Sequence, residues 1–440
     1  MERILLDELK KWKEKETRLP LIVRGARQVG KTWLLKEFGR TCFEDVCYFN
    51  FEQSADLNDV FSGDIHPERI IDFLSAIHGN RILPQKTLVI FDEIQEVPRA
   101  LSSLKSFAEQ APEYMICCAG SLLGIALHQN TSFPVGKVEF LNLGPLSFEE
   151  FLMANEEQQL IDFIKDQKMS AFPAAISSKL TDYLKQYFII GGMPASVVTW
   201  LNTRDFSTVE KKQNEILLTY EQDFSKHAPK NLIPKIRHLW NSVPSQLARE
   251  NKKFIYGLVK EGARAREYED ALLWLFDSGL IRRVSRITKP ALPLRSYEDL
   301  KSFKIYHLDV GLLRAMSELS PAVIIDRVKI FTEFKGALTE QFVLQELSVI
   351  PEIRNVYYWK SEATAEIDFV FSYDTHVVPI EVKSGENLYS KSMSVYKSKY
   401  SPVLSLRISL ANLDYKKGML NIPLYAVFNS IYFMKETGQC

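Results

Sequence analysis

Residues 25–32 read Gly25-Ala26-Arg27-Gln28-Val29-Gly30-Lys31-Thr32. This stretch matches GxxxxGK[ST], a pattern in which a glycine-rich loop points its backbone N–H groups at phosphate oxygens. An apolar run, LPLIVRG, leads into it from residue 19, and a helix-forming run, WLLKEFG, follows it to residue 39. A strand, a glycine loop and a helix in this order attract anions through the loop amides and the helix N-terminus. The stretch therefore predicts that ATP binds along all eight residues, with Lys31 neutralising the β- and γ-phosphates and the Thr32 hydroxyl holding Mg²⁺.

A second pair of residues completes the predicted site about sixty positions later. The run LVIF at 88–91 is a buried strand, and Asp92 and Glu93 follow it directly. Consecutive carboxylates at the end of a strand can divide the chemistry, since Asp92 can hold Mg²⁺ while Glu93 orients or deprotonates the attacking water. Alone, such residues are often only the N-terminal charges of the next helix. After a phosphate-binding loop, the catalytic interpretation is favoured.

Ser121 is the third catalytic candidate. It follows the apolar run YMICCAG at 114–120. A strand placed between the two phosphate motifs would present this hydroxyl to the γ-phosphate or to the attacking water. The same hydroxyl could cap a following helix, LLGIAL, and the two roles are compatible.

The rest of the chain divides into parts by its pattern. Apolar runs alternate with helical segments up to residue 121, which indicates an α/β fold with a parallel sheet covered by helices. Residues 147–225 are predicted to be helical, as a lid or connector. Three helices and two strands then follow in the order typical of a winged helix, and a further α/β unit ends the chain. We expect boundaries at 1–146, 147–225, 226–315 and 316–440.

These motifs together resemble a known group of proteins. The chain is similar to the AAA-type ATPases of bacteria and archaea that carry a C-terminal domain of unknown function. The resemblance implies an AAA-type P-loop NTPase domain, a winged helix and a terminal domain like that of restriction endonucleases. It rests on GARQVGKT at 25–32, FDEIQ at 91–95, AGS at 119–121, PVGKVEFLNLGPLSFEEF at 134–151, YFIIGGMP at 187–194, YHLDVGLL at 306–313 and GALTEQFV at 336–343.

One departure from this group concerns hydrolysis. AAA-type rings usually take an arginine from the neighbouring subunit, but Lys137 is the only Lys or Arg between Ser121 and Phe148. Lysine lacks the planar fork of arginine and is a weaker clamp on spread phosphate charge. Lys137 either takes that place or is a surface residue at a turn, so an oligomer is compatible with the sequence without being required by it.

Four residues near the C-terminus look like a nuclease centre. Asp368 and Glu381 would hold Mg²⁺, Lys383 would stabilise or deprotonate the attacking water, and Glu340 would orient a metal-bound water. Glu381 and Lys383 lie on one face of a strand because side chains repeat every second residue. The alternative is a surface ion pair on a strand, which is common and weakly stabilising.

The formal net charge of the 440 residues is zero, which excludes coating of nucleic acid by bulk positive charge. Residues 226–304 nevertheless carry 17 Lys and Arg against 8 Asp and Glu. Arg264, Arg266, Arg282, Arg283 and Arg286 lie at the helix start and wing of the expected winged helix. Such clusters bind the phosphates of DNA or RNA, although winged helices also dock protein partners.

The apolar runs and the cysteines bear on where in the cell the protein is expected. No apolar run approaches the ~18–20 residues of a transmembrane helix, and the charged first twenty residues lack a signal peptide's apolar stretch. The five cysteines form no CxxC pair, so we interpret them as core residues or as thiols without a role, with no zinc site, in a reducing compartment. The sequence predicts a cytoplasmic Mg²⁺-dependent ATPase that moves a nuclease-like domain on DNA. The alternative is a non-cleaving nucleotide switch or scaffold that docks a protein.

Overall fold

The structure is a computed structural model that describes residues 1–54, 56–121, 133–249, 252–325, 332–385 and 390–439. The chain forms two compact units. Unit 1 comprises Met1–Gly144 and Asp277–Leu280, and unit 2 comprises Pro145–Phe276 and Ile281–Cys440.

Unit 1 is built on a five-stranded parallel sheet in the order β2-β3-β4-β1-β5. Every residue of β3 and β4 is buried, which is why these strands read as unbroken apolar runs. Strand β4 lies between β1 and β3, as expected for the strand that ends before Ser121. The strands are β1 Leu21–Arg24, β2 Asp45–Asn50, β3 Thr87–Asp92, β4 Met115–Gly120 and β5 Glu139–Asn142.

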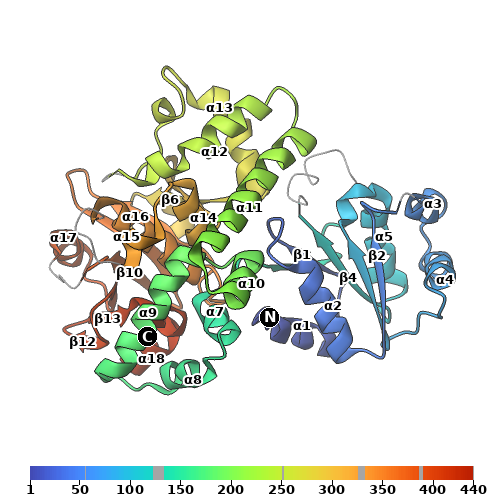
Figure 1. Ribbon diagram of the computed structural model, residues 1–440, viewed down its shortest axis with the longest axis horizontal. Coiled ribbons are helices and arrows are strands. Elements are labelled where there is room, and N and C mark those ends of the chain that lie inside the picture. The colour runs from blue at the N-terminus through green and yellow to red at the C-terminus, as the bar shows by residue number, and fades with distance from the viewer. Residues whose placement is uncertain (55, 122–132, 250–251, 326–331, 386–389, 440) are drawn as a thin grey trace. The chain divides into compact units, whose positions relative to one another are not determined.

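Helices cover both faces of this sheet (Figure 1). Ile22, Val89, Phe91 and Ile116 form one core with apolar side chains of α3, α4 and α5. Helix α2 packs on β2 and β3, and its first residue is Lys31, so the sheet places the P-loop at the carboxyl end of β1. The helices are α1 Leu5–Glu14, α2 Lys31–Cys42, α3 Leu57–Ser62, α4 Pro67–His78, η1 Ile94–Glu96 and α5 Pro98–Gln110.

Unit 2 begins with helices, as the sequence predicts for residues 147–225. Helix α7 starts at a capping box in which Ser147 and Glu150 bond each other's backbone N–H. The helices before the second sheet are α7 Phe148–Ala154, α8 Gln158–Asp166, α9 Ala174–Ile190, α10 Pro194–Thr203, α11 Phe206–His227, α12 Ile233–Leu247, η2 Tyr256–Leu258 and α13 Ala265–Asp277.

The rest of unit 2 is an eight-stranded mixed sheet in the order β12-β13-β11-β10-β9-β8-β6-β7. Its strands are β6 Ile281–Ile287, β7 Glu298–His307, β8 Tyr357–Lys360, β9 Glu366–Tyr373, β10 His376–Val382, β11 Ser405–Ser409, β12 Asp414–Lys416 and β13 Met419–Pro423. The accompanying helices are η3 Leu294–Tyr297, α14 Val310–Met316, α15 Pro321–Ile325, α16 Thr332–Leu347, α17 Lys391–Tyr400, η5 Leu424–Asn429 and α18 Ser430–Glu436.

The hairpin β6–β7, expected as part of a winged helix, belongs to the C-terminal sheet. The hairpin β6–β7 does not close a separate domain, because β6 pairs in parallel with β8 and joins the C-terminal sheet. The sequence suggested a local unit since the two strands are adjacent in the chain. The second edge of β6 is paired about seventy residues later, which no local pattern reveals.

No helix among the described residues is long and apolar enough to cross a membrane.

Candidate nucleotide site

The backbone of residues 25–32, the P-loop, has a shape that only its glycines allow. A Cβ atom on Gly25 would lie 2.1 Å from the carbonyl oxygen of Leu143. Gly30 has φ +96° and is the N-cap of α2, a conformation that L side chains rarely adopt. The loop therefore ends with the free N–H groups of the α2 N-terminus directed at one place.

Lys31 reaches back over this loop. Its ammonium donates to the carbonyl oxygens of Gly25 at 2.9 Å and Ala26 at 2.8 Å. The side chain is 6% exposed, and burial lowers the pKa of Lys31 to about 8, against the opposing effect of Glu93 and Asp92. A buried cation of this kind is stabilised by phosphate oxygens more than by neutral carbonyls.

Asp92 links the two phosphate motifs. The hydroxyl of Thr32 donates to Asp92 Oδ2 at 2.7 Å, and the hydroxyl of Tyr48 donates to the same oxygen at 2.7 Å. A threonine hydroxyl and a carboxylate side by side are the hard oxygen donors that Mg²⁺ prefers, so the donor set fits this ion. Tyr48 was not anticipated from the sequence, and burial together with its bond to Asp92 raises its pKa to about 12.

Glu93 is held apart from Asp92. Its backbone has φ +50°, and its Oε2 accepts hydrogen bonds from the Ser121 hydroxyl at 2.9 Å and the Ser121 N–H at 3.2 Å. Gln95 Nε2 donates to the same oxygen at 2.6 Å. Ser121 therefore positions the carboxylate predicted to act on water. The helix that Ser121 could cap, at 122–127, lies outside the described residues.

Two arginines make contacts at the P-loop, one from within the loop and one from the N-terminal segment. Arg27, within the loop, donates from Nε to Ser121 Oγ at 3.2 Å, and its Nη2 lies 3.9 Å from Glu52 Oε1. Arg3 is buried and donates to the carbonyl oxygens of Val29 and Gly144, each at 2.8 Å. Arg3 lies outside the P-loop in the sequence and supports it through these two hydrogen bonds. Nothing in the charged N-terminal sequence sets Arg3 apart from the other basic residues there.

Lys137 takes a surface position. Its ammonium lies 2.9 Å from Glu109 Oε1, and its side chain is 39% exposed. Its backbone N–H donates to the carbonyl oxygen of Pro134 at 3.0 Å, which closes a turn just before β5. Lys137 is therefore an exposed residue at a turn in the single chain, a position compatible with both interpretations.

Family comparisons agree with this geometry. Residues 17–152 match the family described as "AAA domain". Residues 17–152 form an AAA-type P-loop domain. Residues 181–323 and 335–427 match two families described as domains of unknown function, DUF8612 and DUF4143.

Longer parts of the chain are similar to individual proteins. The uncharacterized protein Rv2008c of Mycobacterium tuberculosis is 22% identical over 402 residues, which are 90% of this chain and 76% of that protein. The Walker-type ATPase PABY2304 of Pyrococcus abyssi is 13% identical, with TM-score 0.44, over 71% of this chain and 94% of its own. AMPPCP-bound DnaA from Aquifex aeolicus is 14% identical, with TM-score 0.29, over 61% of this chain and 73% of its own.

The residues predicted as a nuclease centre lie outside the AAA domain, in unit 2. Glu340 of α16 is bonded by the ammonium of Lys252 at 2.5 Å and the hydroxyl of Tyr306 at 3.0 Å. Lys304 lies 3.9 Å from Glu340 and 2.6 Å from Glu366. Two buried lysines, unremarkable in the sequence, therefore surround the helical carboxylate.

Asp368 belongs to the same cluster. It lies where the register between β8 and β9 shifts, a bulge of the kind that redirects side chains. Its Oδ2 accepts the N–H of Val382 at 2.8 Å. Burial and the charge of Glu340 raise the pKa of Asp368 to about 7.

Glu381 has different partners. Lys383 lies 3.2 Å from Glu381 Oε1, and Arg407 lies 3.7 Å from Glu381 Oε2. The alternation expected for Glu381 and Lys383 on one strand face is thus present. Glu381 thus pairs with Lys383 and Arg407, while Asp368 accepts the N–H of Val382, the residue next to Glu381.

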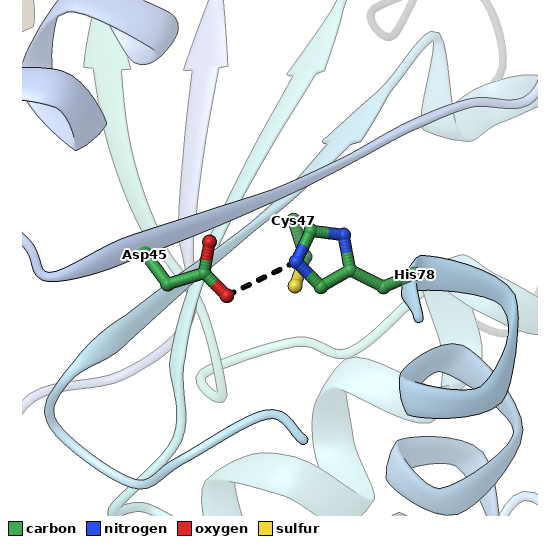
Figure 2. A group of neighbouring side chains, drawn as sticks. All are labelled: Asp45, Cys47 and His78. Carbon is green, nitrogen blue, oxygen red and sulfur yellow. Dashed lines mark hydrogen bonds and ion pairs between the residues drawn. The ribbon is translucent and has the colours of Figure 1, made fainter. Parts of the chain in front are cut away.

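The AAA domain also brings together Asp45, Cys47 and His78, whose ligand atoms lie within 4.8 Å of one another (Figure 2). His78 is the last residue of α4, and its Nε2 lies 3.0 Å from Asp45 Oδ2. Cys47 is fully buried, and burial raises its pKa to about 12. The contact between His78 and Asp45 links α4 to β2. The Cys47 thiol packs in the core, which is one of the two roles expected for the cysteines.

Proposed function

We propose that the protein binds and hydrolyses ATP with Mg²⁺ at the P-loop. The contact between Thr32 Oγ1 and Asp92 Oδ2, at 2.7 Å, carries this proposal because it joins two motifs sixty residues apart. Mg²⁺, when bound, would neutralise charge on the β- and γ-phosphates. Lys31 binds those phosphates, Thr32 and Asp92 hold the ion, and Glu93 orients a water and accepts its proton.

Replacing Lys31 tests the ATPase. We expect Lys31→Ala to lower ATP turnover at least a hundredfold, because no other loop side chain neutralises the phosphates from this position. Lys105→Ala is the matched control, since Lys105 is exposed on α5. Phosphate release measures ATP turnover in both variants. Turnover at the wild-type rate in Lys31→Ala would refute the ATPase proposal.

We further propose that nucleotide state governs binding of DNA by unit 2. Of the 17 basic residues between 226 and 304, twelve are exposed, three are half-buried, and only Lys252 and Lys304 are buried. Exposed Lys and Arg in such number attract phosphates irrespective of sequence. Comparing DNA affinity with ADP, a non-hydrolysable ATP analogue or no nucleotide tests the coupling.

A non-cleaving role for unit 2 is favoured by the lysines around Glu340. Lys252 and Lys304 pair with Glu340, the carboxylate that a nuclease centre would use to orient a metal-bound water. We expect no cleavage of DNA with Mg²⁺ or Mn²⁺. Cleavage by the wild type that is lost in Asp368→Ala and Lys383→Ala would instead establish the predicted nuclease centre of Glu340, Asp368, Glu381 and Lys383.

A further inference from the structure

Arg27 connects the P-loop to Ser121 and Glu93, the residues proposed to act on the attacking water. It is the third residue of the loop, and its Nε donates to Ser121 Oγ at 3.2 Å. Ser121 Oγ in turn donates to Glu93 Oε2 at 2.9 Å. One continuous chain of hydrogen bonds therefore runs from a P-loop guanidinium to the carboxylate proposed as the base.

The P-loop itself carries two cations, Arg27 and Lys31. Burial lowers the pKa of Lys31, and the positive charge of Arg27 adds a smaller lowering, since the two cations of the loop repel each other. The salt bridge from Arg27 to Glu52 spans 3.9 Å, and the Glu52 side chain is 37% exposed, so solvent screens this pair. Phosphate oxygens between Lys31 and Arg27 would relieve the repulsion.

The neighbouring basic residues have other roles. Arg3 donates to backbone carbonyls of residues 29 and 144. The guanidinium of Arg24 lies 4.1 Å from the centre of the Phe140 ring. Lys137 pairs with Glu109. Arg27 is the arginine whose contacts already lead to Ser121 and Glu93.

We propose that Arg27 stabilises the transferring γ-phosphoryl group from within its own chain, in the role that AAA-type ATPases usually give to an arginine of the next subunit. This inference rests on the proposed ATPase function. Its consequence is that turnover does not require a second copy of the chain. A guanidinium suits this role because its planar fork matches two phosphate oxygens at once.

The reaction itself balances with these groups. Water attacks the γ-phosphorus, the bond between the γ-phosphorus and the bridging oxygen breaks, and the water proton passes to Glu93. Negative charge grows on the bridging oxygen of the departing ADP. Arg27 exchanges its bond to Ser121 for the phosphoryl oxygens, while Ser121 keeps its bond to Glu93.

Turnover and transition-state binding test Arg27 directly. We expect Arg27→Ala to lower kcat on the order of a hundredfold or more, as loss of an arginine contact to a phosphoryl group does. ATP affinity should change less than about tenfold, whereas affinity for ADP with aluminium fluoride should fall about as far as kcat. Arg27→Lys should recover less than about a tenth of the lost rate, because it restores charge without the fork. Arg40→Ala, an exposed arginine on α2, is the matched control.

A second measurement tests whether one chain hydrolyses ATP without a neighbouring copy. Turnover per chain should stay constant over a hundredfold dilution. Turnover per chain that falls with dilution, or an Arg27→Ala variant with at least half the wild-type kcat, would overturn the inference. If these results come with an inactive Lys31→Ala, the ATPase proposal stands and only the role of Arg27 fails. An inactive wild type, or an active Lys31→Ala, would remove both.

Discussion

Asp92 and Glu93 are adjacent carboxylates with separate surroundings. Asp92 accepts the hydroxyls of Thr32 and Tyr48, whereas Glu93 turns through a left-handed backbone conformation to Ser121 and Gln95. The turn at Glu93 sends the two side chains to different partners. This separation allows one carboxylate to serve the ion and the other to serve the water.

The proposed role of Glu93 as the base can be tested by a substitution that removes only its ability to accept a proton. Glu93→Gln should keep ATP binding within about threefold and lower kcat on the order of a hundredfold or more, because the amide cannot accept the water proton. Nucleotide titration and steady-state turnover measure the two effects. Glu96→Gln, on an exposed side chain three residues later, should leave both unchanged. Loss of ATP binding in Glu93→Gln would show instead that this residue shapes the site.

A buried carboxylate in unit 2 predicts a dependence of stability on pH. Glu346 Oε1 accepts the N–H of Phe148 at 2.9 Å, and burial raises the pKa of Glu346 to about 8. Between pH 4.5 and 8 the folded state therefore keeps a proton that the unfolded chain loses. Stability falls as pH rises through this window, by an amount on the order of a few kcal/mol.

Glu346→Gln removes this titration and keeps an oxygen that accepts the N–H of Phe148. Urea midpoints at about pH 5 and about pH 8.5 should differ less in Glu346→Gln than in the wild type, with the variant more stable at the higher pH. Glu352→Gln, at an exposed position, should behave as the wild type. An equal pH dependence in all three proteins would rule out Glu346 as the source.

At the scale of elements, packing decides what a helix glycine does. Gly39 lies in α2 where the helix meets β2 and β3, and a Cβ there would lie 2.6 Å from Val46 Cγ2. Gly336 lies in α16, and no described atom is within 4 Å of its Cβ position. The two residues have the same helical conformation with different neighbours.

Gly39→Ala and Gly336→Ala should therefore change stability in opposite directions. Gly336→Ala should stabilise by about 0.5–1 kcal/mol, since alanine reduces the freedom of the unfolded chain. Gly39→Ala should destabilise by about 1–3 kcal/mol, because the strand side chains must move. Calorimetry of both variants measures this, and a stabilising Gly39→Ala would contradict the close packing of α2.

At the scale of the whole molecule, opposite charges are divided along the chain. The formal net charge is zero, yet residues 226–304 carry a net of +9, so the remainder carries −9. The exposed part of the basic excess lies on unit 2 around α12, α13 and the hairpin β6–β7. Carboxylates of the P-loop site belong to the acidic remainder.

If unit 2 binds DNA through its exposed basic residues, removing two of them should weaken binding. Replacing Arg264 and Arg266 with alanine should weaken binding of a short duplex uniformly across sequences. The slope of log affinity against log salt should shrink by up to about 1.8, since each phosphate contact contributes about 0.9. Alanine at Lys416 and Lys417, which are exposed at the other edge of the sheet, is the charge-matched control. Affinity that does not vary with salt would favour the protein-docking alternative.

The sequence alone predicted which residues of the P-loop, β3 and the end of β4 lie close together. The loop, Asp92, Glu93 and Ser121 each follow an apolar strand, and parallel strands bring their carboxyl ends to one edge. The order of residues along the chain thus implied their meeting in space.

Tertiary structure alone decided the contacts made by residues without a motif. Arg3, Tyr48 and the two buried lysines of unit 2 are ordinary in sequence, and they gain their roles from partners far along the chain. The same holds for β6, whose parallel pairing with β8 merges the expected winged helix with the C-terminal sheet. Local patterns report which face of an element is apolar, but the partner of a buried charge or a strand edge is fixed only when distant segments pack together.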